Sequence, residues 1–220
     1  MIDMIQSVFI GISIGILLFG AWYWGFLRFN RQRSQRVLRW LEGAVASHGQ
    51  ISRVEWVSPS QVRARLRLKE CAFRQPSLVA RLAPREMPMR WAAWRWHRRQ
   101  ETLTFEANLL SPPRQGLEIG RTRWTGLTQR WTRKGGDWHT HTVASLFISS
   151  QSEWEPEISN RMTTVVAARE IEFLEVSFRT REPHFSVTFS LEETLRHPCG
   201  ELAIFDSLRE LAEGSPTSRM

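Results

Sequence analysis

Residues 4–27, MIQSVFIGISIGILLFGAWYWGFL, decide the fold of this chain because they contain no charged side chain. As an α-helix this stretch would be about 36 Å long, whereas the hydrocarbon core of a bilayer is about 30 Å thick. A cleaved signal peptide would need a basic start, a shorter apolar core and a small-residue cleavage site. Here the first charge is Asp3, and the stretch ends in aromatic residues between positions 22 and 26. The sequence therefore predicts a single transmembrane anchor over residues 1–29.

Cations lie on only one side of this stretch, which indicates its orientation because Lys and Arg stay on the cytoplasmic side. None precedes the span, and five follow it before the first acid: Arg28, Arg31, Arg33, Arg36 and Arg39. We therefore expect the N-terminus outside and the rest in the cytoplasm, at the inner membrane of a bacterium. Trp22 and its aromatic neighbours fit the belt at the cytoplasmic interface. The two cysteines, Cys71 and Cys199, are compatible with a reducing compartment and also with one disulfide outside it.

Within the span, the segment Gly11-Ile12-Ser13-Ile14-Gly15 fits two sequence patterns. The G-x-S-x-G pattern of serine hydrolases requires a strand-to-helix turn over a soluble sheet, which a lipid-embedded helix cannot supply. The G-x-x-x-G pattern allows two helix backbones to approach closely. Gly11 and Gly15 are therefore candidates for homodimerisation through the span, and an ordinary glycine-containing anchor is the alternative.

The net charge of +8 conceals two oppositely charged parts of the chain. Residues 28–150 hold 23 basic and 8 acidic side chains, a net charge of +15, whereas residues 151–220 hold 7 and 13, a net charge of −6. Of the 30 basic residues, 28 are Arg, which reflects either a compositional bias or selection for phosphate and carboxylate recognition. The apolar fraction of 42% excludes a disordered chain, and two cysteines exclude a disulfide scaffold.

After the span, apolar residues at helical spacing predict a juxtamembrane amphipathic helix over residues 30–48. An α+β domain should follow over residues 49–213, with a disordered tail over 214–220. Helices are expected at 155–168 and 203–212. Alternation predicts strands at 51–58, 61–69, 77–83, 89–99, 101–110, 127–133, 138–149, 170–180 and 184–191. The segment 89–99 is ambiguous, and we favour a strand paired with 101–110 because its three tryptophans do not gather on one side of a helix.

The predicted strand over 61–69 has one basic face, formed by Arg63, Arg65, Arg67 and Lys69. The segment 89–99 adds four arginines interleaved with three tryptophans. Arginines beside aromatic rings suit phosphates together with lipid headgroups or stacked bases. Because the anchor would place the domain near a negatively charged leaflet, lipid is favoured over nucleic acid, for which no recognition module is visible. A solvated face of a half-buried sheet is the plainer interpretation.

Signals of catalysis are weak. His139 and His141 lie two residues apart and would share one strand face with Asp137, so they could bind a transition metal. A catalytic site would need a third ligand, for which His184, Glu170 and Glu172 are the candidates, and a solvated polar face is the alternative. No phosphate-binding glycine loop is present, and no cofactor is expected.

The sequence thus predicts an α+β protein with one N-terminal transmembrane helix and a mostly antiparallel sheet carrying two or three helices. We expect a binding or scaffolding domain at the membrane, with the bilayer and a protein as partners. Its acidic distal part would be available to that protein. A membrane-tethered metalloenzyme using the two histidines, or a tethered nucleic-acid-binding module, is the alternative.

Overall fold

The computed structural model describes residues 2–69, 73–113, 115–121, 138–143, 146–150, 173–196 and 200–213. Its helices are α1 (Ile2–Val45), α2 (Pro88–Trp96), α5 (Leu191–Arg196) and α6 (Gly200–Glu213). Its strands are β1 (Gly49–Ser58), β2 (Gln61–Leu68), β3 (Phe73–Arg81), β4 (Thr102–Leu109), β5 (Leu117–Arg121), β6 (His139–Val143), β7 (Leu146–Ser150), β8 (Phe173–Phe178) and β9 (Phe185–Ser190). The predicted helix at 155–168, strand at 127–133 and tail at 214–220 lie outside these residues.

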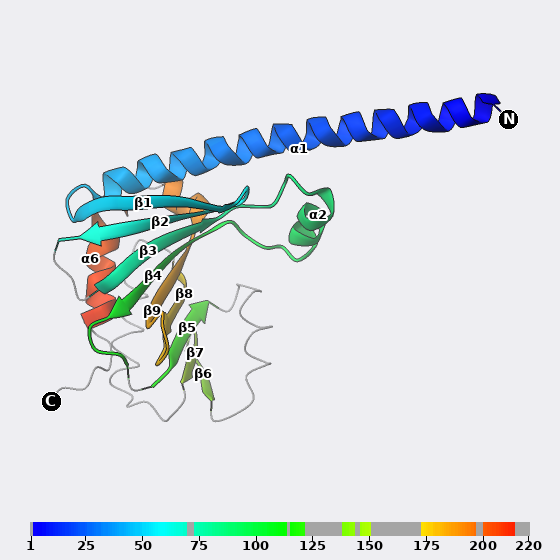
Figure 1. Cartoon of the computed structure of the whole chain (residues 1–220). Helices are drawn as coiled ribbons and strands as arrows, with labels where there is room; N and C mark the ends of the chain where they lie inside the picture. The colour runs from blue at the N-terminus through cyan, green and yellow to red at the C-terminus, as the bar shows by residue number, and fades with distance from the viewer. Residues whose placement is uncertain are drawn as a thin grey trace.

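All nine described strands belong to one sheet in the order β1-β2-β3-β4-β9-β8-β5-β7-β6, and every neighbouring pair is antiparallel. Strands β1 to β4 follow one another as a meander, and β9 then pairs with β4. Figure 1 shows α1 and α6 beside this part of the sheet. The α+β class, the single long apolar helix and the mostly antiparallel sheet are therefore confirmed.

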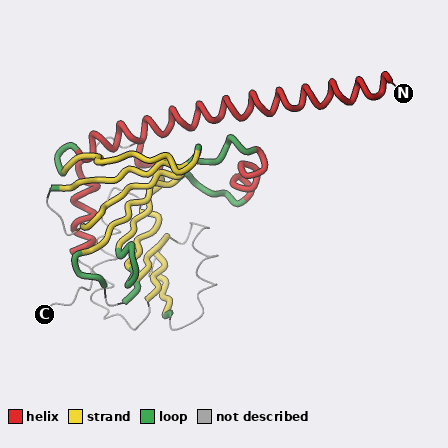
Figure 2. The backbone as a smooth tube through the Cα atoms, viewed as in Figure 1, coloured by secondary structure: helices red, strands yellow, loops and turns green. Residues whose placement is uncertain are grey.

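Helix α1 is one uninterrupted helix of 44 residues, so the predicted span and the predicted amphipathic helix are continuous. No proline interrupts it. Its C-terminal part buries Val37, Leu41, Ala44 and Val45, which recur at the spacing of one helix face. Its N-terminal part extends beyond the sheet (Figure 2). The most apolar 18-residue window has a mean hydropathy of 1.9 and contains no buried residue, and by length and composition α1 is a candidate membrane span.

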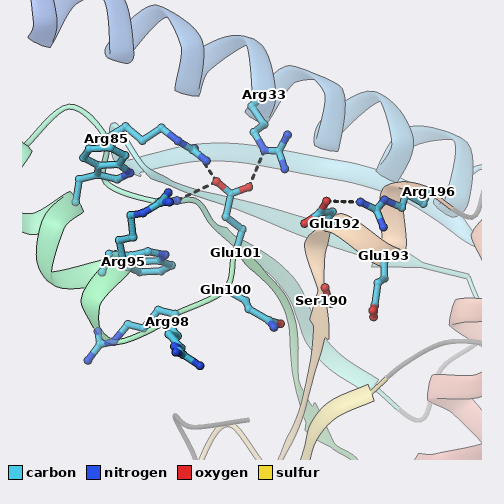
Figure 3. Close-up of a pocket in the computed structure, with 14 residues that line it drawn as sticks. Arg33, Arg85, Arg95, Arg98, Gln100, Glu101, Ser190, Glu192, Glu193 and Arg196 are labelled. Atoms are coloured by element: carbon cyan, nitrogen blue, oxygen red, sulfur yellow. Dashed lines mark hydrogen bonds and ion pairs between the residues drawn. The ribbon is translucent and has the colours of Figure 1, made fainter. Parts of the chain in front are cut away.

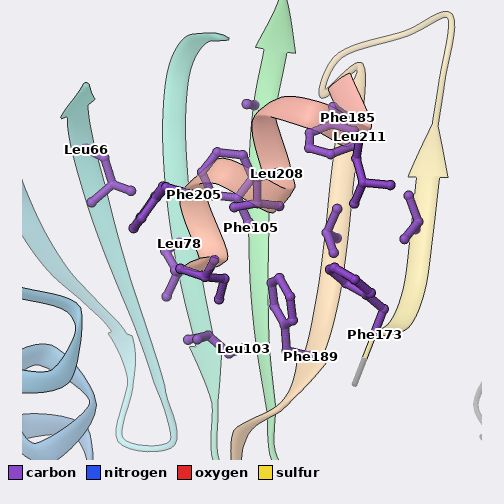
Figure 4. Packing of buried hydrophobic residues seen from close by; sticks show 14 of the residues in the cluster. Leu66, Leu78, Leu103, Phe105, Phe173, Phe185, Phe189, Phe205, Leu208 and Leu211 are labelled. Atoms are coloured by element: carbon purple, nitrogen blue, oxygen red, sulfur yellow. The ribbon is translucent and has the colours of Figure 1, made fainter. Parts of the chain in front are cut away.

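Alternation along β2 and β4 places their buried apolar side chains on one face of the sheet. In β2 the side chains of Val62, Ala64 and Leu66 are buried, whereas the arginines between them lie on the opposite face. Helix α6 covers the core and packs Phe205 against Phe105 of β4 (Figure 4), with ring centroids 6.3 Å apart. The core therefore holds α1, the sheet and α6 together as one body.

The predicted strand over 89–99 is wrong, because residues 88–96 form α2. Pro88 suits the first turn of a helix, where its missing N–H is not needed. The tryptophans do not gather on one side because α2 buries no residue in the core: Trp91 faces α1, whereas Trp96 is exposed. Strand β4 consequently pairs with β3 and β9 rather than with this segment.

The other predicted elements are found with shifted bounds. The first hairpin turns at Pro59 and Ser60. Within the described residues, the strands predicted at 170–180 and 184–191 are found as β8 and β9, which pair with each other. The predicted strand 138–149 is instead two strands, β6 and β7, which pair with each other. The terminal helix expected at 203–212 is α6.

Candidate anion-binding pocket

A pocket of about 410 Å³ opens where α1, the segment 82–101 and α5 meet. This volume is within the range of small-molecule sites. Its walls carry six arginines, three glutamates and two tryptophans (Figure 3). They are Arg33, Arg85, Arg95, Arg98, Arg99, Arg196, Glu101, Glu192, Glu193, Trp91 and Trp94. We call this site the arginine pocket; its charged lining has a formal net charge of +3.

Glu101 joins three separate parts of the chain at one wall of the arginine pocket. Its carboxylate accepts a hydrogen bond from Arg33 Nε of α1 at 2.6 Å and another from Arg85 Nη1 at 2.7 Å. The backbone amide of Ala83 donates a third at 3.2 Å. The carboxylate is only 10% exposed. Because both arginines are partly buried beside it, this network is a structural clamp between α1 and the sheet.

The ionised form of Glu101 is favoured by this environment. Burial by itself would raise the pKa of the carboxyl group. The Ala83 amide and the positive charges of Arg33 and Arg85 outweigh burial, and the pKa lies below its ordinary value of 4.5. Glu101 is therefore a carboxylate at neutral pH and cannot serve there as a proton donor.

Three other arginines of the pocket do not take part in the Glu101 network. Arg95 lies on the last turn of α2, and Arg98 and Arg99 follow it. Within the described residues, none of their side chains has a carboxylate within ion-pair distance. Arg98 has a φ of 48°, in the left-handed region that side chains seldom adopt. The end of α2 and the turn after it thus contribute three arginines to the lining of the pocket.

The opposite wall of the pocket comes from α5. Arg196 forms an ion pair with Glu192, one helical turn away, at 2.5 Å. Glu193 lies beside it, and its Oε2 atom is buried with no hydrogen-bond partner among the residues described. Two acidic groups of the pocket are therefore neutralised by arginines, whereas the third offers an unused acceptor.

The predicted cationic residues are distributed over different surfaces. Arg28, Arg31, Arg36 and Arg39 are exposed on α1, whereas Arg33 is engaged by Glu101. The predicted basic face of β2 exists on the side of the sheet opposite the core. It is partly neutralised, because Arg63 lies 3.8 Å from Glu106 and Arg65 lies 3.5 Å from Glu55. Arg67 and Lys69 are exposed at the end of β2.

The remaining predicted sites are not assembled in the described part of the chain. His139 is exposed on β6, where it pairs with Ser150 of β7, and His141 pairs with Ile148. No group of three metal-ligating side chains occurs among the described residues. Asp137, Glu170 and Glu172 lie outside them, as do the two cysteines. The metal site therefore stays a prediction.

Gly11 and Gly15 lie on the exposed part of α1. A Cβ atom added at either position would have no neighbour within 4 Å in the single chain. Their proposed role in helix association also stays a prediction.

Sequence reasoning missed the arginine pocket although it singled out part of the lining. The interleaved arginines and tryptophans of 89–99 were a signal of binding, but the roles of Arg33, Arg85 and Glu101 depend on contacts between distant segments. No protein-family model matches the chain, and no curated protein matches it either. Function must therefore be inferred from the geometry.

Proposed function

We propose that this protein is a single-pass, membrane-anchored binding module whose domain is held in a fixed orientation against the cytoplasmic leaflet. The observation that carries the proposal is the continuity of α1, which passes from an exposed apolar segment directly into the core of the domain. A flexible linker would leave the domain free to rotate. A helix anchored in the core transmits its tilt to the whole domain.

Contacts at the middle of α1 support a fixed orientation. The Trp22 indole N–H donates to the Arg85 carbonyl oxygen at 3.0 Å, and its ring centroid lies 6.1 Å from that of Trp91 in α2. One turn beyond the apolar segment, the buried Asn30 donates to a Glu86 carboxylate oxygen at 2.8 Å. Helix α1 is therefore hydrogen-bonded to the segment before α2 at two positions, Trp22 and Asn30.

Helix α2 supports contact with the leaflet. Met89, Ala92, Ala93 and Trp96 share one face of it, and Met89 and Trp96 are 84% and 85% exposed. Because Trp91 of α2 lies against Trp22, α2 would lie at the level of the aromatic belt predicted for the cytoplasmic interface. Amphipathic helices with apolar residues on one face and basic residues on the other lie in the headgroup region of a bilayer. In the proposed arrangement α2 is a second membrane contact beside the span.

The domain would then present the rest of its surface to the cytoplasm. Strand β2 runs from Gln61 near the α2 end of the sheet to Leu68 at the other end (Figure 1), a rise of about 23 Å. That distance exceeds the Debye length of about 8 Å at physiological salt. Lys69 therefore lies too far from the leaflet for strong attraction. We propose α2 together with Arg28 and Arg31 of α1 as the leaflet contact and the distal surface as the site for a protein partner.

The depth of α2 provides the test of the proposal. In the full chain with both native cysteines changed to Ser, an environment-sensitive fluorophore is attached at Met89→Cys, or at Leu110→Cys as a control. Both residues are exposed apolar positions, but Leu110 lies beyond the far end of β4. In phosphatidylglycerol-containing vesicles we expect a blue shift and quenching by lipid-borne quenchers only at position 89. Equal, water-like emission at both positions would contradict the proposed docking.

Orientation has its own test. A C-terminal fusion to a cytoplasmic fluorescent reporter should be active, and a fusion to a reporter that works only in the periplasm should be silent. The reverse result would place the domain outside and exclude the cytoplasmic leaflet as its partner.

A further inference from the structure

We infer that the arginine pocket binds a phosphate ester that also carries a hydrogen-bond donor, a hydroxyl or a protonated amine, next to its phosphate. The inference goes beyond membrane anchoring, and it rests on the proposed function only where a lipid headgroup is the source of that phosphate. A soluble phosphate ester is the other source, and the two share the chemistry that the pocket recognises.

The charge balance of the pocket points to an anionic ligand. Arg33 and Arg85 are bound by Glu101, and Arg196 is paired with Glu192. Arg95, Arg98 and Arg99 line the same pocket and have no carboxylate partner among the described residues. Cations gathered within one segment repel each other, and a bound anion would remove that repulsion.

The guanidinium groups of the pocket favour a phosphate over a carboxylate as the bound anion. A guanidinium group donates through a planar fork that matches two phosphate oxygens at once, whereas an ammonium group acts as a point charge. Three such forks in one pocket suit a group with several equivalent oxygens. A single carboxylate would satisfy only one fork well.

The neighbouring groups restrict what is attached to that phosphate. The buried Oε2 atom of Glu193 can accept a hydrogen bond and has no donor among the described residues. Leaving a buried acceptor unpaired is unfavourable, so a ligand that supplies a donor is favoured. Trp91 and Trp94 add partly buried ring surface to the same pocket. Glycerol phosphate, free or as a phospholipid headgroup, has this combination of a phosphate and hydroxyl groups.

The position of the pocket makes a lipid source accessible. Trp91 contributes both to the pocket and to the contact with Trp22 of α1, where the apolar segment ends. A headgroup at the leaflet surface would therefore lie close to the opening if α2 is docked as proposed. A soluble ester could enter from the aqueous side in either case.

Binding to the full chain separates these possibilities. The protein in zwitterionic detergent micelles is titrated calorimetrically with glycerol phosphate. In parallel, the protein in phosphatidylcholine nanodiscs is compared with protein in nanodiscs that also contain phosphatidylglycerol, and protection of Arg95, Arg98 and Arg99 from a guanidinium-modifying reagent is measured. The micelle measurement does not depend on membrane docking, so its failure is distinguishable from failure of the proposed function.

A triple variant and a matched control test the residues. Arg95→Gln, Arg98→Gln and Arg99→Gln together should weaken binding at least tenfold. Changing Arg53, Arg65 and Arg67 of the exposed sheet face to Gln removes the same charge and should change binding less than twofold. The single variant Arg98→Lys keeps the charge but loses the fork, and it should bind severalfold more weakly even if the triple variant fails to fold.

Each measurement has a result that supports the inference and a result that overturns it. Binding of glycerol phosphate in micelles supports a soluble source, and protection only with phosphatidylglycerol supports a headgroup. The absence of both overturns the inference. Equal losses in the triple variant and the matched control would also overturn it, because binding would then reflect net charge and not the pocket.

Discussion

Replacing Glu101 with Gln should destabilise the protein more than any single change of an exposed ion pair. Glu101 accepts hydrogen bonds from Arg33, Arg85 and the Ala83 amide, and the first two connect α1 to the segment before α2. Glutamine has nearly the same shape but no charge, and only one of its two terminal atoms is an acceptor. One of the two arginines would therefore lose its partner and face an amide N–H₂ group.

The magnitude follows from the number and exposure of these bonds. A hydrogen bond to a charged group contributes about 1.5–3 kcal/mol. The side chains of Arg33 and Arg85 are 26% and 24% exposed, so each regains some water when it is released. We expect a net loss of about 2–4 kcal/mol, because the bond from Ala83 is kept. For a chain of this size that loss lowers Tm by roughly 4–16 °C.

Thermal unfolding of the full chain in detergent micelles measures this loss. Glu106→Gln is the matched control, since Glu106 lies on the same strand and has one ion pair, with Arg63, at 3.8 Å. A single partly exposed pair contributes about 1 kcal/mol or less. A double-mutant cycle with Arg33→Gln should show a coupling of about 0.5–3 kcal/mol with Glu101→Gln.

The pH dependence gives a second readout. The pKa of Glu101 in the folded protein lies below 4.5. Its stabilising contribution is therefore complete above that ordinary value and is lost as the pH falls through the lowered pKa. The difference in Tm between the native protein and Glu101→Gln should be largest at neutral pH and should shrink below pH 4.5. A difference that matches Glu106→Gln, or one that does not change with pH, would refute the proposed clamp.

Three further predictions concern the fold and the span. Gly49→Ala should destabilise the protein by about 1–3 kcal/mol in thermal unfolding, because the new Cβ would lie 2.8 Å from a backbone Cα of β2. Phe105→Ala should cost about 3–5 kcal/mol, whereas Leu110→Ala at an exposed site should change Tm little. Gly11→Leu with Gly15→Leu should leave Tm unchanged but abolish cross-linking between spans, and unaltered cross-linking would exclude the G-x-x-x-G interface.

Periodicity predicted the elements that bury one face in the core. The alternation of apolar and polar residues predicted β2 and the hairpin of β8 and β9. The helical spacing of apolar residues predicted α6. The same criterion failed for α2, since a helix that buries no residue has no apolar face directed at the core. Trp91 of this helix faces α1, whereas Trp96 is exposed.

The pairing of distant segments could not be read from local patterns. Residues 101–110 were expected to pair with 89–99, but β4 pairs instead with β3 and with β9, which follows it after more than 70 residues. The clamp at Glu101 likewise joins Arg33 of α1 to a residue 68 positions later. Charge alone predicted that Arg33 belongs to the cationic flank of the span, and its actual partner depends on how α1 is docked.

The sequence by itself determined the long apolar helix, the α+β class and the unequal distribution of charge, because each depends on composition or on spacing within one segment. Only the tertiary structure decided which arginines are neutralised and which surround an open pocket. Whether a guanidinium group is free depends on the carboxylates that folding brings within a few ångströms. Arg33 and Arg98 are the same residue type in similarly basic segments, yet the first clamps α1 to Glu101 and the second lines the opening.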